Sequence, residues 1–108
     1  MTEYIFFVYI LKCRDGSYYT GVASCVEQRV FEHNQGAGCR YTAERRPVEL
    51  VWADSFGTRG EALEAERKIK GWSRKKKEAL MRGDWEMLKK SAKKDFKKKE
   101  NKKHQRQI

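Results

Sequence analysis

The sequence has 108 residues, which is enough for one modest hydrophobic core and too few for two ordinary domains. Its 25 Lys and Arg residues outnumber 15 Asp and Glu residues, so the formal net charge is +10 and an anionic partner is favoured. No apolar run approaches the roughly 18 residues of a membrane-spanning helix, and the first residues do not resemble a secretory signal. We therefore expect a soluble, cytoplasmic protein with no membrane partner.

The positive charge is concentrated at the C-terminal end of the chain. Residues 93–108 contain eight Lys or Arg residues, two acidic residues and almost no apolar side chains. Such a segment cannot bury enough apolar surface to offset the entropy cost of ordering. We expect a folded domain over residues 1–92 and a lysine-rich, disordered tail over residues 93–108. The tail either aids solubility or attracts phosphate groups.

The cysteines predict neither a disulfide framework nor a metal site. Cys13, Cys25 and Cys39 are odd in number, and their spacing matches no paired zinc-ligand pattern. We expect three reduced thiols.

Three segments have the composition of β-strands. Aromatic and β-branched residues dominate residues 4–11 and, after an Asp15-Gly16 turn, residues 18–22. This pattern predicts a β-hairpin. Residues 48–53 are apolar except for Glu49 and are bounded by turn residues, so they predict a third strand.

Capping residues mark where the first two helices begin. Ser24 and Glu27 have the spacing of a capping box and predict a helix over about residues 25–35. Thr58 and Glu61 repeat this spacing and predict a helix that runs to about residue 70.

Two more helices are expected towards the C-terminus. Ser73 can cap a short helix that ends at Gly83, and Asp84 can cap a last one. The element order is then β-β-α-β-α-α. It predicts an α+β fold in which helices flank a central antiparallel sheet of three strands.

Both longer helices place charged side chains beside apolar ones. At 100° per residue, Arg29 and His33 share the core-facing side of the first helix. They could be a snorkelling cation and a neutral packed ring, or they could need an anionic partner. Glu66 lies in the apolar stripe of the second helix and needs a cation, from Arg, Lys or a metal ion. A structural ion pair between Arg29 and Glu66 and a phosphate-cleaving site are both consistent with this pattern.

An ordered set of residues resembles the GIY-YIG nuclease family. Phe7-Val8-Tyr9 and Tyr19-Thr20-Gly21 look like the two halves of the family pattern, although Phe7 replaces the first glycine. The likeness covers roughly residues 4–82 and continues through the three positions Arg29, His33 and Glu66. The chain resembles in particular the small, stand-alone bacterial members, most of which are described only as predicted endonucleases.

The resemblance implies hydrolysis of a phosphodiester bond with one divalent metal ion, Mg²⁺ or Mn²⁺. Glu66 would be the protein ligand of the metal. Tyr9 would act as general base, and Tyr19 would hold the attacking water or share its proton. Arg29 would stabilise negative charge on the phenolate and on the phosphate. His33 would either orient Tyr9 or donate to the scissile phosphate.

Other basic residues are expected to hold the nucleic-acid backbone. They contact phosphates without reading bases, so a preference for DNA structure or end type is expected rather than sequence specificity. The candidates are Arg40, Arg74, Lys75, Lys76, Lys77, Lys93, Lys94 and Lys97.

The leading hypothesis is a metal-dependent DNA endonuclease, with RNA as a possible further partner and no small-molecule cofactor. One alternative is a DNA- or RNA-binding protein that keeps the nuclease fold without turnover. Another is an RNA- or ribosome-associated factor, which the lysine tail alone supports. We also expect Tyr9→Phe to be nearly neutral for folding, because the hydroxyl is placed in an open site.

Overall fold

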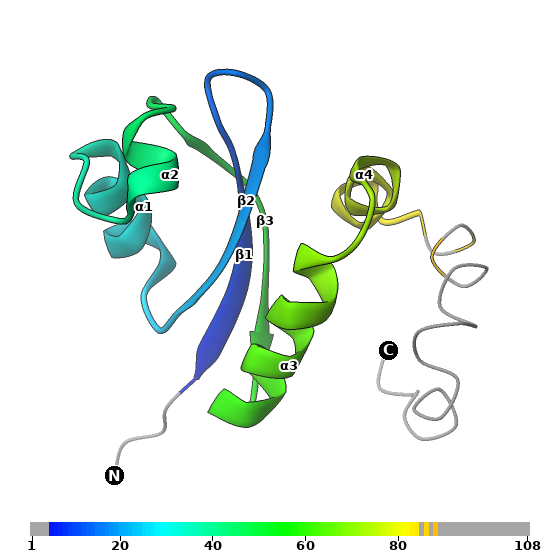
Figure 1. Cartoon of the computed structure of the whole chain (residues 1–108). Helices are drawn as coiled ribbons and strands as arrows, with labels where there is room; N and C mark the ends of the chain where they lie inside the picture. Colours follow the sequence, from blue (N-terminus) through cyan, green and yellow to red (C-terminus); the bar gives the residue numbers. More distant parts are fainter. Residues whose placement is uncertain (1–4, 85, 87, 89–108) are drawn as a thin grey trace, which may run out of the picture. The chain divides into compact units, whose positions relative to one another are not determined.

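The computed structural model describes residues 5–84, 86 and 88, and the chain divides into two compact units after Trp72. The described part of the first unit contains three strands and three helices, and that of the second contains helix α4 (Arg74–Arg82). Figure 1 shows the element order β1, β2, α1, α2, β3, α3, α4. The predicted α+β class is confirmed. In the described residues, no helix is long and apolar enough to span a membrane.

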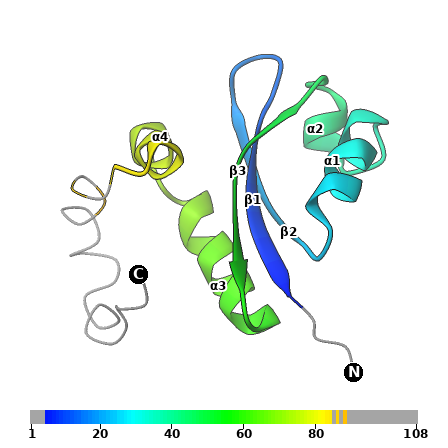
Figure 2. The ribbon, with the colours of Figure 1, turned by 180° about the vertical axis from the view of Figure 1, so that it is seen from behind.

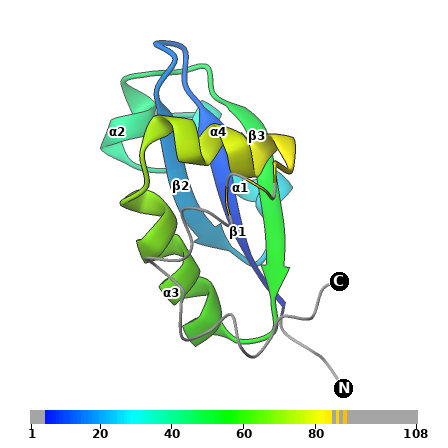
Figure 3. The same cartoon turned by 90° about the vertical axis from the view of Figure 1, so that its right-hand side faces the viewer.

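A three-stranded antiparallel sheet forms the centre of the first unit. The central strand β1 (Phe6–Lys12) pairs with β2 (Tyr18–Ala23) on one side and with β3 (Glu49–Phe56) on the other (Figure 3). The predicted hairpin is confirmed, and Gly16 in its turn has φ +88°, a conformation that glycine adopts without strain. The third strand extends to Phe56, beyond the predicted end at residue 53.

The sheet register determines which side chains share a face. Tyr9 pairs with Gly21, and Leu11 pairs with Tyr19. Since side chains alternate along a strand, these four positions lie on one face of the sheet. Thr20 and its neighbours in the alternate positions lie on the other.

Helices cover the two faces of the sheet. α1 (Val26–Asn34) and α2 (Arg40–Ala43) lie on one side, and α3 (Arg59–Lys70) lies on the other (Figures 1 and 2). The core cluster on the α1 side consists of Tyr9, Leu11, Cys13, Ala23 and Val48, with Tyr19, Val26 and Val30 packed against it. This packing confirms the predicted core-facing side of the first helix.

The predicted helix caps are confirmed for α3 and α4. Thr58 Oγ1 accepts a hydrogen bond from the Glu61 backbone N–H at 3.1 Å. Ser73 Oγ accepts one from the Lys76 N–H, also at 3.1 Å, and α4 ends at Gly83 in the left-handed conformation.

The predicted capping box of the first helix is wrong. The N-cap of α1 is Cys25, which makes no side-chain capping bond, and Ser24 lies one residue too early. Helix α2 was not predicted, because four residues are too few to display a helical periodicity.

Part of the sequence lies outside the described residues. The last predicted helix is described only at Glu86 and Leu88, which are helical, and the Leu88 N–H donates to the Asp84 carbonyl at 3.2 Å. The proposed tail at residues 93–108 lies outside them entirely.

Candidate active site

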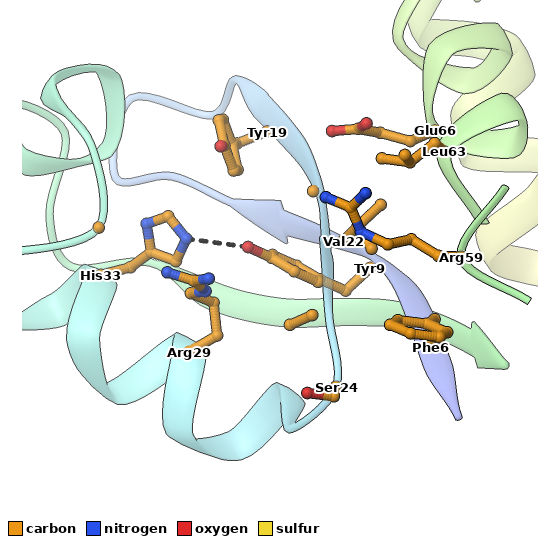
Figure 4. Close-up of a pocket in the computed structure, with 13 residues that line it drawn as sticks. Phe6, Tyr9, Tyr19, Val22, Ser24, Arg29, His33, Arg59, Leu63 and Glu66 are labelled. Carbon is orange, nitrogen blue, oxygen red and sulfur yellow. Dashed lines mark hydrogen bonds between the residues drawn. The ribbon is translucent and has the colours of Figure 1, made fainter. Parts of the chain in front are cut away.

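A pocket of about 360 Å³ at the β2 edge of the sheet brings together the five residues of the family resemblance (Figure 4). Tyr9 and Tyr19 come from the hairpin, Arg29 and His33 come from α1, and Glu66 comes from α3. All these elements belong to the first unit. Helices on opposite faces of the sheet thus supply side chains to one pocket.

A chain of buried hydrogen bonds lies at the back of this pocket. The Tyr9 hydroxyl oxygen is 3.0 Å from His33 Nε2. The other ring nitrogen, Nδ1, is 2.7 Å from Thr42 Oγ1, and Thr42 in turn donates to the Cys39 carbonyl at 3.3 Å. Tyr9, His33 and Thr42 are each at most 2% exposed. Both nitrogens of His33 are therefore engaged within the protein, and of the two predicted roles this geometry favours orienting Tyr9.

Two glycines leave the room that these rings need. A Cβ at Gly21 would lie 2.5 Å from the Tyr9 hydroxyl oxygen and 3.2 Å from the Tyr19 ring. A Cβ at Gly38 would overlap the imidazole of His33. Neither glycine has a positive φ, so close approach of a side chain explains both residues.

Tyr19 belongs to an aromatic group at the pocket wall. Its ring centroid is 5.2 Å from that of His33 and 6.1 Å from that of Tyr41, with which it is stacked. The Arg45 guanidinium carbon lies 3.8 Å from the Tyr41 ring centroid. These contacts fix the orientation of Tyr19 at the pocket wall.

The two oppositely charged residues expected to pair have separate partners. Arg29 Nη1 lies 3.3 Å from a carboxylate oxygen of Glu32, and Lys70 Nζ lies 3.2 Å from one of Glu66. In the structure, Arg29 therefore pairs with Glu32 and not with Glu66. The side chain of Glu66 is only 19% exposed, and it points towards Tyr19 across the pocket (Figure 4).

Burial shifts the pKa values of Tyr9, Tyr19 and His33, and each shift favours the neutral form of the side chain. Burial, reinforced by the neighbouring Tyr19 and opposed by Arg29, raises the pKa of Tyr9 well above its ordinary value. Burial and a hydrogen bond with Cys39 raise the pKa of Tyr19 to about 12. Burial and the positive charge of Arg29 lower the pKa of His33. At neutral pH all three side chains are therefore uncharged.

The donor set of the pocket fits a hard divalent ion that keeps most of its water. Glu66 is the only carboxylate among the residues lining the pocket. The described residues contain no group of three or more His, Cys, Asp or Glu side chains placed to hold a metal. A site with one carboxylate, next to hydroxyl groups and open space, suits Mg²⁺ or Mn²⁺ and does not suit zinc. Cys13, Cys25 and Cys39 are free thiols, as predicted.

The predicted backbone-binding residues fall into three groups. Arg40 on α2 is 89% exposed at its side chain and pairs with Glu44. On α4, Arg74 and Lys75 are exposed, whereas Lys77 is half-buried and burial lowers its pKa. Lys93, Lys94 and Lys97 lie outside the described residues.

Lys76 does not fit the predicted phosphate contact. It is 7% exposed, whereas its neighbours Arg74 and Lys75 lie at the surface. The reason is helical geometry, because Lys76 shares the buried stripe of α4 with Ala79 and Leu80 at i+3 and i+4.

Sequence reasoning missed Arg59, a second arginine of the pocket. Arg59 is the first residue of α3, and Figure 4 shows its side chain reaching into the pocket from the side opposite Arg29. Positions 59, 63 and 66 are i, i+4 and i+7 on one helix, so the periodicity that singled out Glu66 also contained Arg59. Leu63 completes this helix face.

Comparisons with known proteins find similar sequences and a similar solved structure. The sequence model of the GIY-YIG catalytic domain matches residues 5–79. The chain is 51% identical over 75 residues to a UPF0213 protein of Staphylococcus saprophyticus, an alignment that covers 69% of this chain and 92% of the relative. It is 54% identical over 71 residues to one of Staphylococcus epidermidis, covering 66% and 87% of the two chains. The solution structure of a protein from E. faecalis matches with a TM-score of 0.53 and 42% identity, over 73% of this chain and 84% of that one.

Proposed function

The chain belongs to the GIY-YIG catalytic domain family, and on this premise we propose that it is a metal-dependent endonuclease acting on DNA. The supporting observation is the convergence of Tyr9, Tyr19, Arg29, His33 and Glu66 on one pocket. Two tyrosines, two arginines and a half-buried carboxylate form a site suited to an anionic substrate that reacts with water.

In this proposal Tyr9 accepts a proton from the attacking water. A buried phenol with a raised pKa is protonated at neutral pH, so it cannot act alone as a base. The hydrogen bond to His33 provides a solution, because Tyr9 can pass its own proton to Nε2 while it accepts one from water. Tyr19, on the neighbouring strand, would position that water.

The two arginines would hold the phosphate. Arg29 on α1 and Arg59 on α3 reach the pocket from opposite sides, and a phosphodiester between them can accept hydrogen bonds from both. Fixed guanidinium groups stabilise the additional negative charge of the transition state without reorganising.

Glu66 would hold a divalent ion, Mg²⁺ or Mn²⁺, together with water and a phosphate oxygen. When bound, such an ion makes a coordinated water easier to deprotonate and polarises the phosphate. The contribution of Glu66 is one negative charge on a helix, positioned across the pocket from Tyr19.

Substrate choice would depend on DNA structure rather than sequence. We propose residues 1–92 as the nuclease domain and residues 93–108 as a lysine-rich tail that adds phosphate contacts. Arg40, Arg74 and Lys75 would add further ones at the surface. Contacts of this kind supply affinity without base readout.

The test is cleavage of linear, supercoiled, single-stranded and branched DNA with Mg²⁺ or Mn²⁺. Glu66→Gln should abolish cleavage and leave salt-sensitive DNA binding intact. Glu64→Gln is the matched control, because Glu64 lies on the same helix, pairs with Lys68 and does not line the pocket. It should cleave like the wild type.

Two results would count against the proposal. Cleavage that persists at wild-type rates in Glu66→Gln would show that another site, or a contaminant, is responsible. Tight DNA or RNA binding without cleavage of any substrate would identify a binding protein on the nuclease fold. Deletion of residues 93–108 then tests the RNA-associated alternative, which requires a loss of RNA affinity.

A further inference from the structure

Thr42 is a buried residue next to the proposed catalytic histidine, and the proposed reaction does not itself require it. It lies on the short helix α2 and is fully buried. Its hydroxyl oxygen is 2.7 Å from His33 Nδ1, 3.3 Å from the Cys39 carbonyl oxygen and 3.5 Å from Cys39 Sγ. A hydroxyl has one proton to donate, so the choice of acceptor determines the protonation pattern of its neighbours.

The contact between Thr42 and the Cys39 carbonyl shows which way the Thr42 hydroxyl proton points, towards that carbonyl or towards His33 Nδ1. If Thr42 donated to His33 Nδ1, its oxygen and the Cys39 carbonyl oxygen would face each other with no proton between them. A carbonyl oxygen only accepts hydrogen bonds, so Thr42 donates to Cys39 and its lone pair faces Nδ1. His33, which is neutral, then carries its proton on Nδ1 and donates it to Thr42.

We propose that Thr42 is a positioning residue that fixes the tautomer of His33 and thereby makes Tyr9 the donor in the Tyr9–His33 hydrogen bond. With the proton on Nδ1, Nε2 has a lone pair that accepts a hydrogen bond from the Tyr9 hydroxyl. The lone pairs of the Tyr9 oxygen then remain available to the pocket, where they can accept a proton from water.

The role in catalysis rests on the proposed nuclease function. The attacking water oxygen forms a bond to phosphorus as the bond to the leaving oxygen breaks, and the leaving oxygen takes the electron pair of that bond and is protonated by solvent water. The water proton passes to the Tyr9 oxygen, and the Tyr9 proton passes to Nε2. The resulting imidazolium keeps its Nδ1–H bonded to Thr42, and after the product leaves, the extra proton returns through Tyr9 to solvent. The opposite tautomer would point Nε2–H at the Tyr9 oxygen and remove the proton acceptor.

Gly38 and the surrounding packing hold the ring in place for this arrangement. A side chain at position 38 would overlap the imidazole, and Tyr9 and Tyr19 border the ring on other sides. A ring so confined cannot rotate to exchange its two nitrogens. The tautomer is therefore decided by the partner at Nδ1.

Two substitutions separate the hydroxyl from the shape of the side chain. Thr42→Val keeps the volume and removes the hydroxyl, so a proton on Nδ1 would be buried without an acceptor and should move to Nε2. Thr42→Ser keeps the hydroxyl and removes a methyl group. We expect Val to lower kcat by about 100-fold with little change in KM, and Ser to restore most of the rate.

The decisive readout is independent of activity. Nitrogen-15 NMR of His33 in the full chain should show protonated Nδ1 in the wild type and Thr42→Ser, and protonated Nε2 in Thr42→Val. A wild-type protein with its proton on Nε2, or a Thr42→Val variant with unchanged tautomer and kcat, would overturn the proposal.

The two proposals fail in different ways. A wild-type protein that cleaves no DNA but has the expected tautomer would refute the nuclease function and leave the positioning by Thr42 standing. If Thr42→Val does not fold, the wild-type and Thr42→Ser spectra still decide the tautomer.

Discussion

The Tyr9 hydroxyl oxygen and His33 Nε2 lie 3.0 Å apart, and both side chains are buried although 24 positions separate them in the chain. The structure thus revises the expectation that Tyr9→Phe is nearly neutral for folding. The substitution removes a buried hydrogen bond and should cost about 1–3 kcal/mol of unfolding free energy. Urea denaturation measures this cost. Tyr41→Phe at the surface is the control, and an equally small effect of both changes would contradict the prediction.

Gly21 allows the ring of Tyr9 to lie close to the backbone of β2. In Gly21→Ala the new methyl group would lie 2.5 Å from the Tyr9 hydroxyl oxygen, so the ring must move. We expect a loss of about 1–3 kcal/mol of stability, together with loss of cleavage. Thermal unfolding and kcat/KM are the measurements. Gly60→Ala is the matched control, since nothing lies within 4 Å of a Cβ at that helical position, and it should be tolerated.

Arg59 should contribute one phosphate contact to nucleic-acid binding. The binding constant for duplex DNA falls as the salt concentration rises. On a plot of the two logarithms, the slope for Arg59→Ala should be less steep than that of the wild type by about 1. Binding is measured without a divalent ion, so that cleavage does not interfere. Arg67 is an exposed residue of the same helix that does not line the pocket, so Arg67→Ala should change this slope less. Equal slopes for Arg59→Ala and the wild type would remove Arg59 from the interface.

Stability should fall at both ends of the pH range, for opposite reasons. The pKa of His33 is lowered by burial, so below its ordinary value of 6.5 the unfolded chain binds a proton more readily and stability decreases as pH falls. The pKa of Tyr9 and Tyr19 is raised by burial, so above their ordinary value of 10.0 the unfolded chain loses protons first and stability decreases as pH rises.

Thermal unfolding measured between pH 5 and 11 tests both decreases in stability, the acid limb below about pH 6.5 and the alkaline limb above about pH 10. Tyr9→Phe should reduce the loss of stability at alkaline pH, because one of the two phenols with a raised pKa no longer titrates. His33→Gln should flatten the acid limb. An alkaline limb of the same slope in Tyr9→Phe would show that this tyrosine does not titrate between the folded and unfolded states as its burial implies.

Local features of the fold could be predicted where the physical cause is local. Thr58 and Ser73 cap their helices because a hydroxyl at the N-cap position can accept a hydrogen bond from the backbone N–H three residues later. Ser24 has the same local pattern, yet α1 begins one residue later, with Cys25 at its N-cap. The burial of Lys76 follows from the stripe it shares with Ala79 and Leu80, which a charge count does not reveal.

The sequence by itself determined the family, the order of the main elements and the five residues that meet in the pocket, because each belongs to a recognisable spacing. Only the tertiary structure decided which hydrogen bonds and packing contacts these five residues make. Gly38 and Thr42 lie within the stretch that resembles the family, but the sequence indicates no role for either of them. They matter because chain folding places them against the ring of His33. Hydrogen-bond partners and excluded volume depend on distances of a few tenths of an ångström between residues far apart in the chain, and no local pattern encodes such distances.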